Sequence, residues 1–289
     1  MQANYMIFAV FCLISLSLWF KKQNLTILVC TIVAITSYWF NYISFNGLIL
    51  IAVSGMSAHL IQLHSKLKHY LVFVVLVSII FAMLSSNFPH ENYVMLLDNV
   101  RLSEHSKPFI MGINIEKTLV AILLASHLIH FNQTQTEWVK CIKVAILPSV
   151  LVCLLLLTPA IMTNFVRFEP KFPLPATMLF ALHNIFLVCL AEEVFFRGII
   201  QQWLHQLCGK YLTKLAPWLP ILIASLLFGL FHFRSGLIMI IFASIAGLFY
   251  GYVYQKTKRI EASMLVHFCL NMVHFLVFTY PSWDKIILN

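Results

Sequence analysis

Three charged residues lie close together in a segment that is otherwise apolar. The sequence EEVFFRG, residues 192–198, carries Glu192, Glu193 and Arg197 between apolar runs on both sides. A charged side chain at membrane depth is costly, so it is usually paired and usually serves a function. The segment is therefore the first candidate for a reaction centre, because a positioned carboxylate can act as a general base.

The spacing of these residues gives the two acids different roles. On a helix, residues four apart share a face, so Glu193 and Arg197 can neutralise each other. Glu192 points about 100° away from Glu193 and has no such partner in its own helix. We therefore expect Glu193 and Arg197 to be structural and Glu192 to be available for chemistry. The alternative is a carboxylate pair at a helix end in contact with lipid headgroups, but the flanking apolar residues favour function.

Two later apolar segments carry further polar groups that a hydrolytic site needs. FGLFH, residues 228–232, places His232 one turn after Phe228, and HFCLN, residues 267–271, places His267 and Asn271 on one helix face. A carboxylate, two imidazoles and a carboxamide are sufficient to activate a water and to stabilise an oxyanion. Taken alone, His232 is more typical of a membrane interface. The His267/Asn271 pair alone is slightly more typical of interhelical hydrogen bonding.

Helices must bring these segments together, and the composition predicts that those helices lie in a membrane. Of 289 residues, 61% are hydrophobic and only 10% are charged, whereas roughly a quarter are charged in soluble domains. We predict an all-α polytopic fold of about eight to ten transmembrane helices, since a span needs about 20 apolar residues. The candidate spans are 5–20, 25–43, 47–64, 70–86, 118–131, 141–163, 176–203, 219–233, 236–255 and 262–280.

The gaps between the spans predict how the chain is threaded. Residues 87–117 form the longest polar gap, which we predict to be an extramembrane loop that can include an amphipathic turn. The lysines and arginines of the gaps place the N-terminus outside if there are ten crossings. With these boundaries, His232 would lie far from the face nearest Glu192 and His267. We therefore expect the helix of residues 219–233 to begin earlier, to tilt, or to end early.

Two further patterns concern single helices. Lys21 and Lys22 follow the apolar stretch 5–20, whereas the charge of a secretory signal precedes it, so we expect a retained first helix. Ala243, Gly247 and Gly251 repeat every four residues, which predicts close helix packing along one face.

Several functional classes receive no support from the sequence. The net charge of +9 is spread over the gaps, and a nucleic-acid-binding protein would gather it on one surface. The seven cysteines lack CxxC or other metal spacing, so we expect apolar packing residues and no disulfides or metal ligands. No GxSxG, HExxH or P-loop motif is present, which leaves serine hydrolases, zincins and NTPases without support.

In that order, EEVFFRG, FGLFH and HFCLN resemble the motifs EExxxR, FxxxH and HxxxN of the CAAX prenyl protease and bacteriocin-processing family, the glutamic-type intramembrane proteases. The resemblance covers roughly residues 176–280. We expect one integral membrane unit with a motif-free region, 1–164, and a protease core, 165–289. The resemblance implies the following roles: Glu192 activates water, His232 helps to position it, His267 and Asn271 stabilise the oxyanion, and Glu193, Arg197 and Phe228 support the site.

By the same resemblance, the protein is expected to be an intramembrane endopeptidase that needs no cofactor. A zinc ion bound by Glu192, His232 and His267 is the alternative, since the ligand types alone allow it. The expected partners are the lipid bilayer and a membrane-embedded or lipid-anchored substrate, such as a protein with a prenylated C-terminus, and no nucleic acid. We expect a multi-pass protein of the bacterial inner membrane. The alternatives from other classes are a proton-coupled transporter and a non-catalytic membrane scaffold or immunity protein.

Overall fold

Helices formed by the apolar runs make up most of the described structure. The structure is a computed structural model that describes residues 2–64, 68–85, 93–211 and 217–284. Up to residue 162 its elements are α1 (Gln2–Ser17), α2 (Gln23–Trp39), α3 (Phe45–Leu63), α4 (Lys68–Ser85), β1 (Tyr93–Val100), β2 (Phe109–Asn114), α5 (Ile115–Leu128) and α6 (Gln135–Met162).

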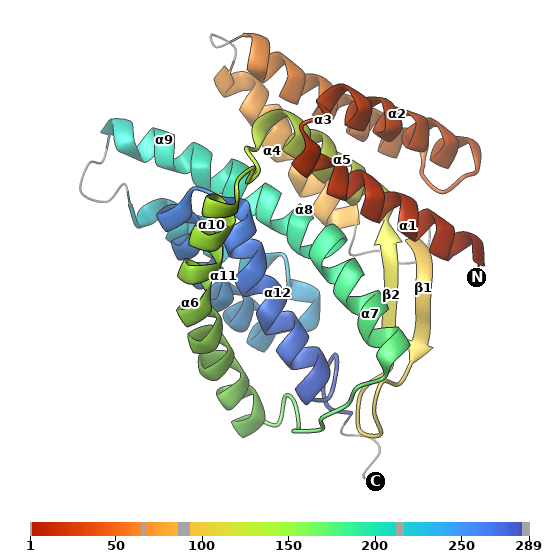
Figure 1. Cartoon of the computed structure of the whole chain (residues 1–289), viewed down its shortest axis with the longest axis vertical. Coiled ribbons are helices and arrows are strands. Elements are labelled where there is room, and N and C mark those ends of the chain that lie inside the picture. The colour runs from red at the N-terminus through yellow and green to blue at the C-terminus, as the bar shows by residue number, and fades with distance from the viewer. Residues whose placement is uncertain (1, 65–67, 86–92, 212–216, 285–289) are drawn as a thin grey trace.

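A long kinked rod follows, and three helices complete the chain. The rod comprises α7 (Leu174–His183), η3 (Asn184–Cys189), α8 (Leu190–Glu193), η4 (Val194–Gln201) and α9 (Gln202–Tyr211). The last helices are α10 (Leu219–Leu230), α11 (Leu237–Thr257) and α12 (Ile260–Val277). Figure 1 shows the rod crossing the middle of the molecule with α12 beside it. The motif-bearing segments thus lie at the centre of the fold.

Six of the described helices are long and apolar enough to cross a membrane. They are Gln2–Phe20, Phe45–Leu63, Gln135–Met162, Leu174–Gly209, Leu237–Thr257 and Ile260–Val277. Three shorter apolar helices are Gln23–Trp39, Lys68–Leu84 and Leu219–Leu230. Many large apolar side chains of α1–α4 and α6 are exposed on the outside of the molecule, as expected of a surface in contact with lipid. The structure therefore supports an integral membrane protein, and the number of eight to ten crossings stays a prediction.

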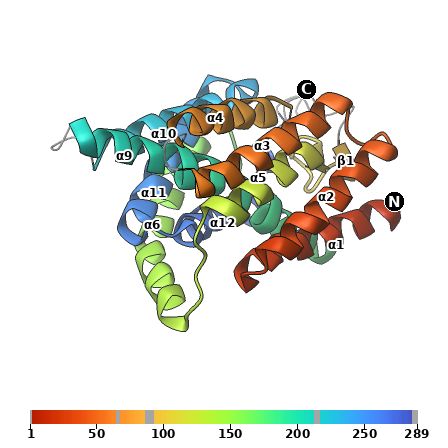
Figure 2. The ribbon, with the colours of Figure 1, turned by 90° about the horizontal axis from the view of Figure 1, so that it is seen from above.

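Helix α5 is shorter and far more buried than a span in contact with lipid. It has 14 residues, of which eleven are buried, and it packs against α2, α3 and α4 on one side and against α8 and η4 on the other. Seen from above, α1 and α2 lie on one side of the molecule, and α11 and α6 lie on the other (Figure 2). Helix α5 therefore lies between α2, α3 and α4 on one side and the rod on the other, whereas α1 contacts the rod directly.

The predicted loop 87–117 contains regular structure. Strands β1 and β2 pair in an antiparallel hairpin from Tyr93 opposite Asn114 to Val100 opposite Phe109, with two register irregularities. The Asn114 side chain accepts a hydrogen bond from the Lys117 amide at 2.7 Å and begins α5 at Ile115, three residues before the predicted span. Residues 87–92 of the predicted loop lie outside the described residues.

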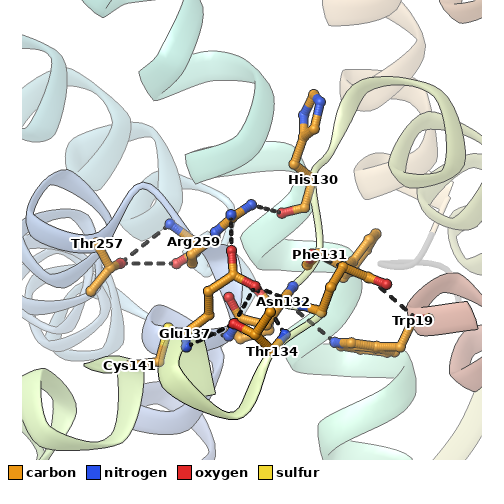
Figure 3. A network of polar contacts seen from close by, with 11 residues as sticks. Trp19, His130, Phe131, Asn132, Thr134, Glu137, Cys141, Thr257 and Arg259 are labelled. Carbon is orange, nitrogen blue, oxygen red and sulfur yellow. Dashed lines mark hydrogen bonds and ion pairs between the residues drawn. The ribbon is translucent and has the colours of Figure 1, made fainter. Parts of the chain in front are cut away.

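A polar network joins the end of α1, the α5–α6 connection and the start of α12 (Figure 3). The buried Glu261 carboxylate accepts hydrogen bonds from the Asn132 amide at 2.5 Å and from Trp19 Nε1 at 3.2 Å. Arg259 forms an ion pair with Glu137, whose side chain also caps α6. These contacts fix the N-terminal end of α12, the helix that carries His267 and Asn271.

Candidate active site

The rod segment that carries both acids has an unusual helical geometry. The η3 and η4 segments are π-helical, and the four residues of α8 between them are α-helical. π-helical turns are rare and occur often at functional sites, because the extra residue per turn re-aims the side chains that follow. Glu192 and Glu193 therefore lie on a short α-helical step between two wider ones.

Glu193 and Arg197 form a fully buried ion pair. Arg197 Nε lies 3.2 Å from Glu193 Oε2, and both side chains are 0% exposed. The contact lacks hydrogen-bond geometry, so its attraction is electrostatic. The guanidinium also lies over the rings of Phe228 and Tyr250, with its central carbon 4.8 and 5.2 Å from their centroids. Aromatic faces stabilise a cation in this position, so the arginine is held on two sides.

A seam of backbone acceptors on α11 completes the surroundings of Arg197. Its Nη2 donates to the carbonyl of Gly247 at 3.1 Å, and one turn later Gln201 Nε2 donates to the carbonyl of Gly251 at 2.9 Å. A Cβ at Gly247 would lie 3.0 Å from the Cα of Ser225 on α10. The small residues predicted to allow close packing thus also give polar side chains of the rod access to main-chain oxygens.

His267 lies between the two adjacent carboxylates. Its Nδ1 is 2.9 Å from Glu193 Oε1, and its Nε2 is 3.9 Å from Glu192 Oε2. The ring stacks on Tyr250, with centroids 4.6 Å apart and an angle of 16° between the planes. The contact between Nδ1 and the Glu193 carboxyl oxygen favours the tautomer in which Nδ1 carries the proton. The Nε2 atom faces Glu192 at a distance that is too long for a direct hydrogen bond, and a water placed beside the line joining the two atoms can reach both.

Glu192 has a partner from outside the rod. The ammonium of Lys117, the third residue of α5, lies 2.9 Å from Glu192 Oε1. The side chains are only 13% and 9% exposed, respectively. The ion pair leaves Oε2 on the side of His267. Sequence reasoning missed this contact because it placed Lys117 in an extramembrane loop.

Helix α10 ends at Leu230, so His232 lies just after the helix and not inside it. For the predicted span 219–233, an early end is one of the three expected ways in which His232 can come near Glu192 and His267. The Nδ1 atom of His232 bonds the Phe228 carbonyl at 2.9 Å. His232 and His267 both line a cavity of about 90 Å³ between α6, α10, α11 and α12.

Asn271 lines the same cavity and extends the polar cluster toward the rod. Its Nδ2 donates to Asn184 Oδ1 at 3.3 Å, and Cys189 Sγ donates to the same oxygen at 3.2 Å. An asparagine amide carries two N–H groups, and this bond uses one of them. The neighbouring His183 lies apart from the cluster, bonded to the Gly112 carbonyl on β2 at 2.9 Å.

The residues at this site do not fit a zinc ion. Within the ranges that the structure describes, no three histidine, cysteine or acidic side chains converge as a metal site requires. The ammonium of Lys117 pairs with Glu192 Oε1, and its positive charge would oppose a second cation at the same carboxylate.

The structure therefore brings four of the predicted residues together from three elements. Glu192 and Glu193 come from α8, Arg197 from η4, and His267 from α12. Lys117 and Tyr250 join them without having been singled out in the sequence. Lys117 carries a weak signal, a cation directly before an apolar run. Tyr250 carries none, because an aromatic residue in an apolar helix is expected for packing alone.

A comparison with known protein families matches the part of the chain that carries most of these residues. Residues 174–273 match the sequence model of the family described as Rce1-like, type II CAAX prenyl endopeptidase Rce1-like. The matched region is about a third of the chain, and it includes Glu192, His232, His267 and Asn271 but not Lys117. No curated protein and no solved structure matches the chain.

Proposed function

We propose that this membrane protein hydrolyses a peptide bond near the prenylated C-terminus of a membrane-anchored protein, with Glu192 as the base that activates water, because residues 174–273 match the sequence model of the Rce1-like type II CAAX prenyl endopeptidases. The observation that carries the proposal is the 3.9 Å gap between Glu192 Oε2 and His267 Nε2. A water in this gap can be bonded by both groups. No metal takes part in this mechanism.

The reaction begins with a water held between Glu192 and the imidazoles. Glu192 Oε2 takes a proton from the water as its oxygen forms a bond to the scissile carbonyl carbon. The carbonyl π electrons move to oxygen and give a tetrahedral oxyanion. When the C–N bond breaks, the proton held by Glu192 passes to the leaving amine. A positioned general base contributes about 10²–10⁴-fold to such a rate.

The other residues act on orientation and charge. Because the Nδ1 proton of His267 is directed to Glu193, Nε2 accepts a hydrogen bond from the water. The second N–H of Asn271 is the donor we assign to the oxyanion, because Asn271 lines the cavity. A single oxyanion donor contributes on the order of 10²–10³-fold. His232, which also lines the cavity, is assigned to orienting the water. Glu193 and Arg197 fix His267 and are not consumed in any step.

The test uses the purified full chain in lipid nanodiscs and a farnesylated peptide that ends in a CAAX sequence. We expect Glu192→Gln to lower kcat by at least about 100-fold, since the amide cannot accept the proton. The matched control is Glu104→Gln, which changes an exposed carboxylate in the same way, and we expect it to cleave at the rate of the unmodified chain. Cleavage by Glu192→Gln at the unmodified rate contradicts the mechanism.

The same preparation tests the cofactor and the location. We expect a strong chelator to leave cleavage unchanged, whereas a loss that added zinc restores would support the zinc alternative. Bacterial inner-membrane residence is part of the proposal, and it is checked by fractionation of the expressed protein. If the unmodified chain does not cleave the peptide but carries a proton-coupled flux across vesicle membranes, the result would instead support a transporter.

A further inference from the structure

A lysine from the motif-free half of the chain lies at the centre of the polar cluster. Lys117 is outside the family match at residues 174–273, and it is separated from Glu192 by 75 residues in sequence. Its ammonium lies 2.9 Å from Glu192 Oε1, and its side chain is 13% exposed. Long side chains near a membrane protein's surface normally extend toward water. Lys117 instead extends into the protein, toward one carboxylate.

The fold holds this lysine in place through its backbone. Lys117 is in the first turn of α5, where its amide donates to the Asn114 side chain at 2.7 Å. The helix is buried along most of its length and packs directly against α8 and η4. The ammonium is therefore delivered to α8 by a rigid element, which is the arrangement that a precise site requires.

The charges around Glu192 explain why a cation is needed there. Burial disfavours an ionised carboxylate, so an acid at this depth without a cation would hold its proton and could not act as a base. The other nearby cation, Arg197, is engaged by Glu193 at 3.2 Å. His267 is directed to Glu193 through Nδ1 at 2.9 Å. Lys117 is the cation in direct contact with Glu192 among the described residues.

The geometry also divides the two oxygens of Glu192 between separate tasks. Oε1 accepts from Lys117, and Oε2 faces His267 Nε2 at 3.9 Å. A carboxylate that is anchored through one oxygen keeps the lone pairs of the other directed at the water. Without the lysine, the side chain could rotate away or present either oxygen. The proton from water could then pass to either oxygen of Glu192, and neither oxygen would be held in a fixed position.

We propose that Lys117 is a positioning residue for hydrolysis, which keeps Glu192 ionised and directs Oε2 to the nucleophilic water. This inference rests on the function proposed above. Lys117 keeps its proton throughout, while the proton taken from water travels on Glu192 Oε2 to the leaving amine. The N-terminal half of the chain is thereby part of the catalytic unit and not only an anchor for the matched region.

The experiment compares Lys117→Met, Lys117→Arg and the control Lys143→Met, which changes an exposed lysine. Cleavage of the farnesylated CAAX peptide is followed in nanodiscs over pH 5–9. We expect Lys117→Met to lower kcat by about 100-fold, the low end of a general base's contribution, with KM changed less than about threefold. Its acidic limb should move to higher pH, since loss of a neighbouring cation favours the protonated acid. Lys117→Arg should keep the acidic limb and part of the rate, and the control should match the unmodified chain.

Each other outcome overturns the inference. A Lys117→Met protein with unchanged kcat and pH profile shows that the lysine is dispensable, and a faster one shows that it restrains Glu192. A raised KM with unchanged kcat shows that it binds substrate. If Lys117→Met does not fold, Lys117→Arg decides, because inactivity in a folded arginine variant contradicts a charge-based role. The Glu192→Gln result separates the two proposals. If Glu192→Gln is active, the proposed function is refuted and the inference falls with it; if Glu192→Gln is inactive while Lys117→Met cleaves normally, only the inference is refuted.

Discussion

The buried ion pair between Glu193 and Arg197 leads to a prediction in which stability and activity separate. Both side chains are fully buried, and they are 3.2 Å apart. Removing one partner of such a pair leaves an uncompensated charge and costs about 3–5 kcal/mol of unfolding free energy. At about 2–4 °C per kcal/mol for a chain of this size class, Glu193→Leu or Arg197→Met alone should lower Tm by roughly 6–20 °C.

The double variant Glu193→Leu/Arg197→Met should recover most of that loss. Both charges are then absent, and apolar replacement of a buried pair is often nearly neutral. Activity should not recover, because Glu193 Oε1 is also the acceptor for His267 Nδ1 at 2.9 Å. The double variant is therefore expected to be stable and at least about tenfold slower, because His267 is no longer held in its orientation and misplacing a group by about 1 Å can cost about 100-fold.

Thermal unfolding in nanodiscs, followed by tryptophan fluorescence, and peptide cleavage measured on the same samples check both parts. Glu104→Leu, at an exposed carboxylate, is the control and should unfold within about 0.5 kcal/mol of the unmodified chain. Strictly additive Tm losses in the double variant would refute the coupling. Full activity in the double variant would refute the assigned role of Glu193 in holding His267.

Two further predictions concern packing and charge outside the acid cluster. Gly229→Ala should lower the free energy of unfolding by about 1–3 kcal/mol, because its Cβ would lie 2.6 Å from the Ile240 carbonyl oxygen on α11. Thermal unfolding compares this variant with Gly209→Ala, whose Cβ would meet open space. Equal Tm values for the two variants would contradict the prediction. Burial lowers the pKa of Lys171, in the α6–α7 connection, from 10.5 to about 8. The unfolded chain therefore holds this proton more tightly between these values, so stability should rise from pH 8 to 10 relative to Lys171→Met. Parallel Tm curves for the two proteins over this range would be the contrary result.

The apolar runs predicted the helices well but not the hairpin or the start of α5. A long apolar run has a single low-energy solution in lipid, a helix that satisfies its own backbone groups. Strand β1, with the sequence YVMLLDNV, has no alternation of polar and apolar residues that would identify it as a strand. The charges at Glu116 and Lys117 moved the predicted start of α5 to residue 118, because buried charges are not expected without known partners.

The candidate site was predictable where its chemistry is local and not where it depends on tertiary contacts. The four-residue spacing of Glu193 and Arg197 predicts their pairing from one helix alone. His267 between the two acids, and Lys117 beside Glu192, depend on how α12 and α5 pack against the rod, which no spacing encodes. The sequence therefore identified one function of Glu193, the ion pair, and left its contact with His267 to the structure.

The two bonds from the rod to α11 restrict how the protein can open. Arg197 and Gln201 reach the carbonyls of Gly247 and Gly251 in step, four residues apart on each helix. A piston-like slide of α11 by one residue would break both bonds together. Leaving such buried groups unpaired costs about 1–3 kcal/mol each, and more where one is charged. The two bonds together therefore oppose axial movement of α11 along the rod and hold Arg197 at a fixed height beside Glu193.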